Sequence, residues 1–410
     1  MPISFPHLAY PQKPRKEFGL SLVFFFLVFF LLAFIFVLPA AQAQQAQTYR
    51  VGILVPLTGF LALEGESQRN GALLALENPP AALKQAGITL DYEIFDTGSS
   101  PEGASLAFNR LLSHKNLVAI SGPILGTQML AILPLARDAA IPLLTISGTA
   151  SLTQQGNPWV FRFFPGDSLV KNIQVRYAVE ERKLTEPVIL YQTTAYGQSG
   201  LGYLQQYFQA KNIAVLEAVA IDPNTRDLTP ILLRLMEKHP DSFIVQLHAA
   251  SNALLIQQAR QMGIGLPIIA GSAMHQPSTA ALLSPKELAN VCAETGTAPL
   301  ADQRPDVQAF VTAYQKRFNR QPDAFALAQY DALQMLMQAL AATASETHLG
   351  DPSQSIVMVR RQIQHFLTTT PFQGVGMRYV ADNQGNMAHS GLIICYDGNS
   401  RLPIVVQRYE

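Results

Sequence analysis

The sequence predicts an α/β protein with two doubly wound, Rossmann-like lobes joined by a hinge of several strands. Its length supports this, since 410 residues exceed the usual size of one domain. From Tyr49 onward, short β-rich apolar runs alternate with longer segments of helical periodicity, the pattern of a parallel sheet covered by helices. That series occurs twice, and further elements follow that must return to the existing sheets, so the chain crosses between lobes several times.

The first series fills the region from position 50 to position 146. The pair Ser100-Pro101 locates one helix start, because serine caps a helix and proline is favoured at its first position. The predicted strands are residues 50–57, 88–95, 117–121 and 142–146, and the predicted helices are residues 66–76, 101–112 and 127–139.

The second series repeats the pattern up to position 270. Leu201, Leu204 and Phe208 fall on one helical face, which gives the apolar stripe that a helix needs to cover a sheet. The predicted strands are residues 188–191, 214–221, 243–247 and 267–270, and the predicted helices are residues 167–180, 199–210, 230–238 and 252–262.

The remaining chain is predicted to complete both lobes. We expect helices at 305–318, 322–342 and 353–367 and strands at 372–380, 390–396 and 403–408. Residues 159–166 connect the two series without a glycine- or serine-rich linker, so the lobes should be closely coupled. The expected division is residues 49–161 plus 300–370 for the first lobe and residues 162–299 plus 371–410 for the second.

The first 48 residues have the features of a targeting segment. Lys13, Arg15 and Lys16 precede an uncharged run at 18–38, and the small-residue triplet Ala41-Gln42-Ala43 follows it. The triplet favours cleavage of a signal peptide after Ala43. The run is also long enough to span a bilayer, so a retained membrane anchor stays open as an alternative. In either case the mature part is exported to the periplasm or another extracytoplasmic space.

Cys292 and Cys395 are the only two cysteines. Both lie in apolar stretches, which is typical of buried thiols that act as small hydrophobic residues. Export permits a disulfide, but the sequence does not show whether the two positions are adjacent in space. Pairing therefore stays open.

Composition and motifs argue against polyanion binding and against catalysis. Lysine plus arginine equal aspartate plus glutamate at 29 each, so no net charge draws the protein to nucleic acid. The stretch Gly197-Gln198-Ser199-Gly200-Leu201 lacks the last glycine of a nucleophile elbow, and no phosphate-binding loop is complete. The eight histidines show no metal-ligand spacing. We therefore expect no enzyme activity, no cofactor and no metal.

Candidate binding residues follow the predicted strands, because ligands of open α/β sheets bind beyond the carboxyl ends of the strands. A helix start at Gly126 and Thr127 offers free backbone N–H groups that favour an anion. Ser147 and Thr149 supply hydroxyls after the next strand. Turns and helix caps use the same residue types, so each feature also fits a purely structural role. In the second lobe, the residues that could close over a ligand are Tyr196 and His248.

Five segments resemble one protein family in their order and spacing. They are Val51 to Gly59, Ser121-Gly122-Pro123, Ser147-Gly148-Thr149, Ala195-Tyr196-Gly197 and Gln258 to Gly263. Together they look like the type I periplasmic binding proteins of the leucine/isoleucine/valine-binding family, over the chain from about Tyr49 to its end. The resemblance implies a Venus-flytrap fold that closes on a small polar solute and presents it to an ABC permease.

The resemblance also implies a site. Gly126 and Thr127 fall where the family holds a ligand carboxylate, with glycine in place of a serine, and Ser147 and Thr149 match contacts to the ligand head group. Tyr196 and His248 match aromatic walls of the second lobe.

Two departures from the family pattern concern ligand charge. The acid that pairs with a ligand ammonium should fall near Ala273, where alanine cannot serve, and a first-lobe tyrosine is replaced by Glu64. Glu64 is either a ligand-binding acid on the other side of the site or a solvated loop charge.

The expected function is that of an ABC-transport solute receptor. The expected solute is a branched-chain amino acid, an amide, a urea-like compound or a small carboxylate. The other hypotheses are a membrane-anchored sensor that signals to a partner protein and, less favoured, an amide hydrolase on the same scaffold.

Overall fold

The computed structural model describes residues 1–7, 9–12, 47–346 and 356–409. It divides into a unit of residues Met1–Gln45 and a unit of residues Ala46–Glu410. Residues 1–7 and 9–12 contain no helix or strand, and the predicted apolar run at 18–38 and its cleavage triplet lie outside the described residues. In the part of the chain that the structure describes, no helix is both long enough and apolar enough to cross a membrane.

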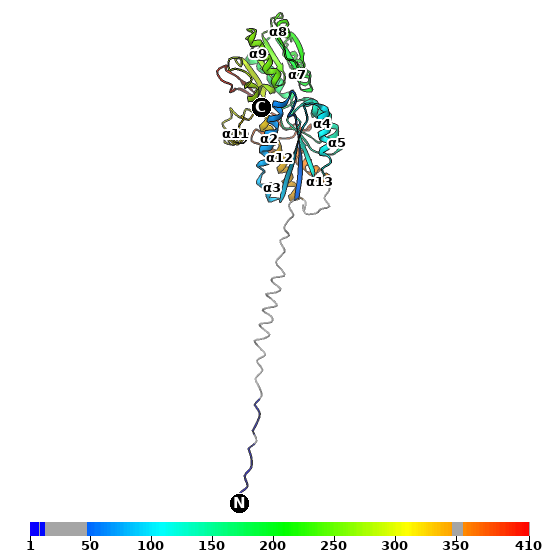
Figure 1. Cartoon of the computed structure of the whole chain (residues 1–410), viewed down its shortest axis with the longest axis vertical. Coiled ribbons are helices and arrows are strands. Elements are labelled where there is room, and N and C mark those ends of the chain that lie inside the picture. Colours follow the sequence, from blue (N-terminus) through cyan, green and yellow to red (C-terminus); the bar gives the residue numbers. More distant parts are fainter. Residues whose placement is uncertain (8, 13–46, 347–355, 410) are drawn as a thin grey trace. The chain divides into compact units, whose positions relative to one another are not determined.

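The first sheet is parallel and has the strand order β2-β1-β3-β4-β5. This order reverses direction beside β1, as a doubly wound sheet requires. The strands are β1 Gln47–Val55, β2 Ile88–Asp96, β3 Leu117–Ser121, β4 Leu143–Thr145 and β5 Val160–Arg162. The helices between them are α2 Ala62–Glu77, α3 Ala81–Gln85, α4 Pro101–Leu111 and α5 Gly126–Asp138, and η1 Ala150–Leu152 follows β4 (Figure 1).

The strand β5 is a correction to the sequence-based interpretation, which took residues 159–166 as a connection. Its three residues are all buried and pair with β4. A run this short shows no alternation of apolar and polar residues, so periodicity cannot reveal it.

The second sheet has the order β14-β13-β10-β9-β8-β6-β7. Its parallel strands are β6 Pro187–Gln192, β7 Glu217–Ile221, β8 Ser242–Gln246, β9 Ile268–Ala270 and β10 Val291–Thr295, and its antiparallel edge consists of β13 Gly391–Cys395 and β14 Ile404–Tyr409. The helices are α6 Asp167–Arg176, which continues as the π-turn η2 Tyr177–Glu181, α7 Ala195–Ala210, α8 Thr229–Met236, α9 Ala249–Gln261, η3 Ser272–His275 and α10 Pro277–Ala280.

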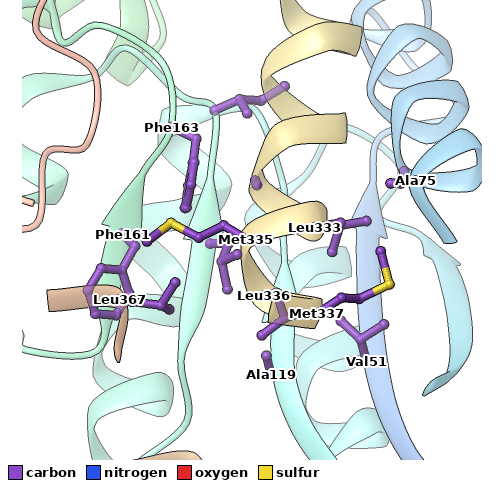
Figure 2. Packing of buried hydrophobic residues seen from close by; sticks show 14 of the residues in the cluster. Val51, Ala75, Ala119, Phe161, Phe163, Leu333, Met335, Leu336, Met337 and Leu367 are labelled. Atoms are coloured by element: carbon purple, nitrogen blue, oxygen red, sulfur yellow. The ribbon is translucent and has the colours of Figure 1, made fainter. Parts of the chain in front are cut away.

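The C-terminal helices complete the first lobe. They are α11 Pro305–Phe318, α12 Ala324–Glu346 and α13 Ile356–Thr369. In Figure 2, α12 runs along the first sheet, and side chains such as Leu333 and Leu336 pack in the same buried cluster as Val51 and Ala119. The short hairpin of β11 Phe372–Gln373 and β12 Arg378–Tyr379 adds its aromatic rings to this first core as well, although we expected residues 371–410 in the second lobe.

The chain passes from one core to the other at three places. Phe164 belongs to the first core and Ile173 to the second, Ala293 belongs to the second core and Val307 to the first, and the third passage leads from Ala388 to Leu392. These passages form the multi-strand connection that the sequence predicts, and they place the carboxyl ends of both sheets at one junction.

Cys292 and Cys395 form a disulfide between β10 and β13. The two residues stand opposite each other in the antiparallel register of these strands. The pairing that the sequence left open thus follows from a long-range register, which fastens the C-terminal edge of the second sheet to its parallel part.

Candidate functional site

A pocket lies at the junction of the two lobes. Its wall is formed by residues that follow the carboxyl ends of strands or begin helices, which is where ligands bind in α/β sheets. The apolar part of the wall consists of Leu61, Ile124, Leu125, Ile146 and Phe325. The side chains on its polar part are Glu64, Ser147, Tyr196, His248 and Ser272, and Gly148 and Ala273 complete the lining.

Glu64 reaches the cavity because α2 begins very close to the end of β1. A Cβ atom at the next residue, Gly65, would lie 2.0 Å from the carbonyl oxygen of Pro56, so only glycine permits this approach. The Glu64 side chain is 2% exposed. It is therefore a buried acid on the cavity wall and not a solvated loop charge.

The Glu64 carboxyl connects the two lobes. Its Oε1 atom accepts a hydrogen bond of 2.9 Å from the backbone N–H of Ala249, at the start of α9. Its Oε2 atom is buried and has no hydrogen-bond partner. Burial raises the pKa of this carboxyl to about 7, with a smaller raising effect of the charge on Asp323. Near neutral pH the group therefore exists in both protonation states.

His248 is held as a neutral ring beside this acid. Its ring stacks on Tyr196 with 5.1 Å between centroids, and its Nε2 atom lies 3.1 Å from the Thr194 hydroxyl. Burial lowers the pKa of His248 to about 3. The 3.9 Å separation of its Nδ1 atom from Glu64 Oε1 is consequently not an ion pair at neutral pH. Burial also raises the pKa of Tyr196 well above its usual value, so its hydroxyl stays protonated.

The start of α5 and the turn after β4 pack closely against each other. A Cβ atom at Gly126 would lie 2.1 Å from the Thr149 hydroxyl, so glycine is required there. The first backbone bond of this helix runs from Met129 N to Leu125 O, which leaves the N–H groups before Met129 without helical acceptors. The Thr149 hydroxyl is buried and has no partner.

The structure thus brings the predicted residues to one place in two layers. The wall itself includes Glu64, Ser147, Tyr196 and His248. Gly126 and Thr149 are not on the wall but adjoin Leu125 and Gly148, which are. The remaining predicted residue, Thr127, uses its hydroxyl to accept a hydrogen bond of 2.9 Å from Ala195 N in the other lobe.

Four buried charges behind the wall escaped the sequence analysis. Arg162 Nη1 donates to the carbonyl oxygens of Gly148 at 3.2 Å and of Thr149 at 2.7 Å, and so holds that turn in place. The backbone N–H of Asp167 donates to Gly148 O at 2.7 Å, and burial raises the pKa of the Asp167 carboxyl to about 6.

The other two charges form an ion pair. Lys171 Nζ lies 2.6 Å from Glu294 Oε1, and both side chains are 0% exposed. The same oxygen accepts a hydrogen bond of 2.7 Å from the backbone N–H of Ser272, a wall residue. Charged residues at ordinary helix and strand positions carry no pattern that marks them as buried, so the sequence offered no signal for these four.

One helix of the second lobe contacts the first lobe along a single face. Residues 195, 199 and 203 of α7 are spaced four apart, so they lie on the same face. Besides the bond from Ala195, the Ala150 N–H donates to Ser199 Oγ at 3.0 Å, and Gln154 Nε2 donates to the Tyr203 hydroxyl at 2.9 Å. Together with the bond between Glu64 and Ala249, these contacts hold the lobes together around the cavity.

The described residues contain no group of three or more histidine, cysteine, aspartate or glutamate side chains that could hold a metal ion. The polar groups of the wall are suited to hydrogen bonding and the apolar groups to packing. The arrangement can therefore bind a small molecule that is partly polar and partly apolar.

A model of the family described as periplasmic binding protein matches residues 48–395. Among curated proteins, the chain is 26% identical over 308 residues to the Leu/Ile/Val-binding protein homolog 8 of Brucella abortus, covering 71% of this chain and 75% of that protein. It is 20% identical over 303 residues to a leucine-, isoleucine-, valine-, threonine- and alanine-binding protein of Pseudomonas aeruginosa, covering 73% of this chain and 80% of that protein.

Solved structures show the same fold. A leucine-binding protein of Thermotoga maritima matches with a TM-score of 0.76 at 21% identity, covering 88% of this chain and 99% of that one. A solute-binding protein of an ABC transporter from Rhodopseudomonas palustris, in complex with 3,4-dihydroxybenzoic acid, matches with a TM-score of 0.77 at 19% identity, covering 88% and 97%. The predicted α/β fold with two parallel-sheet lobes is thereby confirmed.

Proposed function

We propose that this chain, which belongs to the periplasmic binding protein family, serves an ABC permease by closing its two lobes on a small solute. It is a solute-binding protein and not an enzyme. The observation that carries the proposal is the cavity at the carboxyl ends of both sheets, with one polar and one apolar part of its wall. Both the family description and the pocket are consistent with binding of a small solute.

The solute should have a polar end and a compact apolar body. The turn at 147–149 and the start of α5 together present hydroxyls and free backbone N–H groups, which suit a polar or anionic head group. Leu61, Ile124 and Phe325 suit an aliphatic or aromatic body. The Pseudomonas relative is named for binding leucine, isoleucine, valine, threonine and alanine, and the Rhodopseudomonas protein holds an aromatic acid, so both classes of solute belong in the first screen.

The proposed ligand contacts fall into two groups. Glu64, Ser147, Tyr196 and His248 contact the solute from the wall. The second group, Gly126, Thr127 and Thr149, shapes the head-group end, and only Thr149 offers a free hydroxyl.

Closure is proposed to move the two cores as bodies about the three connecting passages. The first body consists of residues 49–164, 300–346 and 356–370 together with the hairpin that packs on it, and the second consists of residues 165–299 with β13 and β14. Ligand selects the closed state by bridging both walls. The hydrogen bonds along α7 form on closing and add to the stability of that state.

The chain acts outside the cytoplasm, as its family does. Residues 1–48 are proposed as the export signal, cleaved after Ala43 to release the protein into the periplasm. Amino-terminal sequencing of the exported protein distinguishes cleavage from retention as an anchor.

A thermal-shift screen followed by calorimetry tests the proposed function. Amino acids, amides, ureas, short carboxylates and hydroxybenzoates are added to the exported protein, and a ligand that binds only the native state raises its melting temperature. We expect saturable binding of one solute per chain without conversion of the solute. Absence of binding across the panel, or release of a product, would contradict the proposal.

The Thr149→Ala variant locates the site. The Thr149 hydroxyl lies just behind the wall without a partner, and we expect it to reach the solute head group, so its removal should weaken binding roughly tenfold, while the melting temperature without solute stays close to that of the unmodified protein. Thr312→Ala, on the exposed face of α11, removes a hydroxyl far from the cavity and is the matched control. Equal affinity in both variants would exclude Thr149 from the site.

A further inference from the structure

We propose that Glu64 selects the solute, because its free carboxyl oxygen accepts a hydrogen bond from an N–H group of the solute. Solutes with an ammonium or amide group are therefore preferred over simple carboxylates. This inference rests on the proposed function, since it requires a solute in the cavity. It goes further by naming the chemistry that the cavity prefers.

The orientation of the carboxyl is fixed before a solute arrives. Glu64 Oε1 is occupied by the Ala249 N–H at 2.9 Å, so rotation of the carboxyl would break that bond. The other oxygen, Oε2, is buried without a partner on a residue that lines the cavity. A buried acceptor without a donor costs about 1–3 kcal/mol, which a donor on the solute would recover.

No charged donor in the described structure neutralises this carboxyl. From the segment that leads into α9 it faces His248, which is neutral at physiological pH because burial lowers its pKa. From the start of α12 it feels the negative charge of Asp323. From α7 the neighbouring wall residue is Tyr196, whose hydroxyl stays protonated. Since none of these described groups is a cation, a cationic group of the solute would supply the counter-charge that the Glu64 carboxylate lacks.

The opposite wall is also backed by oxygens that lack donors. Asp167 Oδ2 and Glu294 Oε2 are buried and unpartnered, as is the amide oxygen of Gln246. Asp167 lies directly behind the wall, since its Oδ1 atom would be 3.3 Å from a Cβ at Gly148. Glu294 accepts from Ser272 N on the wall. These carboxylate and amide oxygens outnumber the unpartnered hydroxyls of Tyr196 and Thr149, so the set favours a solute that donates.

Protons report which kind of solute binds. Because the pKa of Glu64 is about 7, roughly half of the molecules carry a proton there at pH 7 before binding. An ammonium group beside Oε2 favours the ionised carboxyl and lowers its pKa, so binding releases about half a proton. A solute carboxylate at the same place would favour the protonated form, and binding would take protons up.

Calorimetry with solutes of one shape tests the inference. L-leucine, 4-methylpentanamide and 4-methylpentanoate share an apolar body but differ in their polar ends. Each is titrated at pH 7 in phosphate and in Tris, whose different ionisation enthalpies reveal the number of protons exchanged. We expect leucine or the amide to bind roughly 10- to 100-fold more tightly than 4-methylpentanoate, and leucine to release protons.

Two variants of the same helix separate selection from structure. Glu64→Gln retains an acceptor for Ala249 but places an NH2 group where Oε2 stood, so proton release should vanish and the preference for leucine over 4-methylpentanoate should fall at least about tenfold. Glu66→Gln, a partly exposed position on the same helix, should change neither quantity. If Glu64→Gln does not fold, the proton count of the unmodified protein decides alone.

The outcomes distinguish the two proposals. Tight binding of 4-methylpentanoate or benzoate with proton uptake would overturn the selection by Glu64 and leave the solute-binding function intact. An unchanged preference in Glu64→Gln would overturn it as well. Failure of every solute in the screen to bind would instead overturn the proposed function, and the inference with it.

Discussion

The ion pair between Lys171 and Glu294 provides the sharpest test of how the wall is supported. We consider the substitution Lys171→Met, which preserves much of the length and apolar volume of the side chain. In the unmodified protein the two charged groups lie 2.6 Å apart with 0% exposure, and Glu294 also holds the backbone of Ser272 at 2.7 Å. The substitution leaves the Glu294 carboxylate buried without its cation.

The expected magnitude follows from burial. Removing one partner of a fully buried ion pair costs about 3–5 kcal/mol in the free energy of unfolding, because an uncompensated charge remains in a medium of low dielectric constant. Adding Glu294→Gln to Lys171→Met removes that charge but keeps an acceptor for Ser272 N. The double variant should therefore recover most of the loss.

An exposed pair with the same geometry is the control. Lys211 Nζ also lies 2.6 Å from a carboxylate, that of Glu180, but the two side chains are 39% and 38% exposed. Solvent screens such a pair, so Lys211→Met should cost less than about 1 kcal/mol.

The assay is urea unfolding at pH 7, followed by circular dichroism and by intrinsic fluorescence to check that both probes agree. The expected order of stability is the unmodified protein and Lys211→Met, then the double variant, then Lys171→Met. Equal losses in Lys171→Met and Lys211→Met would refute the argument from burial. A double variant no more stable than Lys171→Met would refute the role of the isolated charge.

Three further predictions follow from other parts of the molecule. Replacing both cysteines, Cys292→Ala with Cys395→Ala, opens a loop of 103 residues and should lower the free energy of unfolding by up to about 4.7 kcal/mol in the chain-entropy model. An unfolding midpoint in urea equal to that of the unmodified protein would contradict a disulfide in the folded protein. Ser199→Ala and Tyr203→Phe change the α7 face that contacts the first lobe, and each should weaken solute binding severalfold in calorimetry, although neither side chain contacts the solute. The control Tyr207→Phe should leave the affinity unchanged, because the Tyr207 hydroxyl forms its hydrogen bond within the second lobe. The folded-state pKa of Glu64 is raised from 4.5 to about 7, so between these pH values the folded protein holds more protons than the unfolded chain, and the Glu64 contribution to stability falls as the pH rises. From pH 4.5 to 7, the free energy of unfolding of Glu64→Gln should therefore rise relative to that of the unmodified protein by up to about 3 kcal/mol. Parallel curves of stability against pH would refute the raised pKa.

Much of the fold was predictable from local patterns. The helix predicted at 305–318 coincides with α11 Pro305–Phe318, because proline at its start and the apolar periodicity both mark it. The start of α4 at Pro101 is equally clear, since the Ser100 hydroxyl accepts from Gly103 N at 3.0 Å as a cap.

What escaped prediction depends on distant parts of the chain. The strand β10 is buried on both faces, so its five residues show no alternation, and its pairing with β13 also decides the disulfide. Position alone suggested that Glu64 was either a ligand-binding acid or an exposed loop charge. Its burial arises from α9 in the other lobe, about which the residues around position 64 carry no information. The ion pair of Lys171 and Glu294 is hidden for the same reason, since 123 residues separate its partners.

The pocket and the contacts between the lobes lie in the same part of the molecule. Four of the hydrogen bonds that join the lobes, those through Glu64, Thr127, Ala150 and Gln154, lie around the space proposed for the solute. A bound solute would restrict opening of the lobes, and opening would break these bonds.

The central claim is that a solute is held between two closing lobes. Hydrogen–deuterium exchange with and without saturating solute tests this claim most directly. The account predicts slower exchange on both sides of the cavity, in residues 195–203 and 249–252 of the second lobe and residues 147–150 of the first, whose N–H groups include the donors Ala195, Ala249 and Ala150. Exchange in the buried strands β1 and β8 should stay as slow as before. Solute-induced protection on one side only, or none at saturation, would contradict the account.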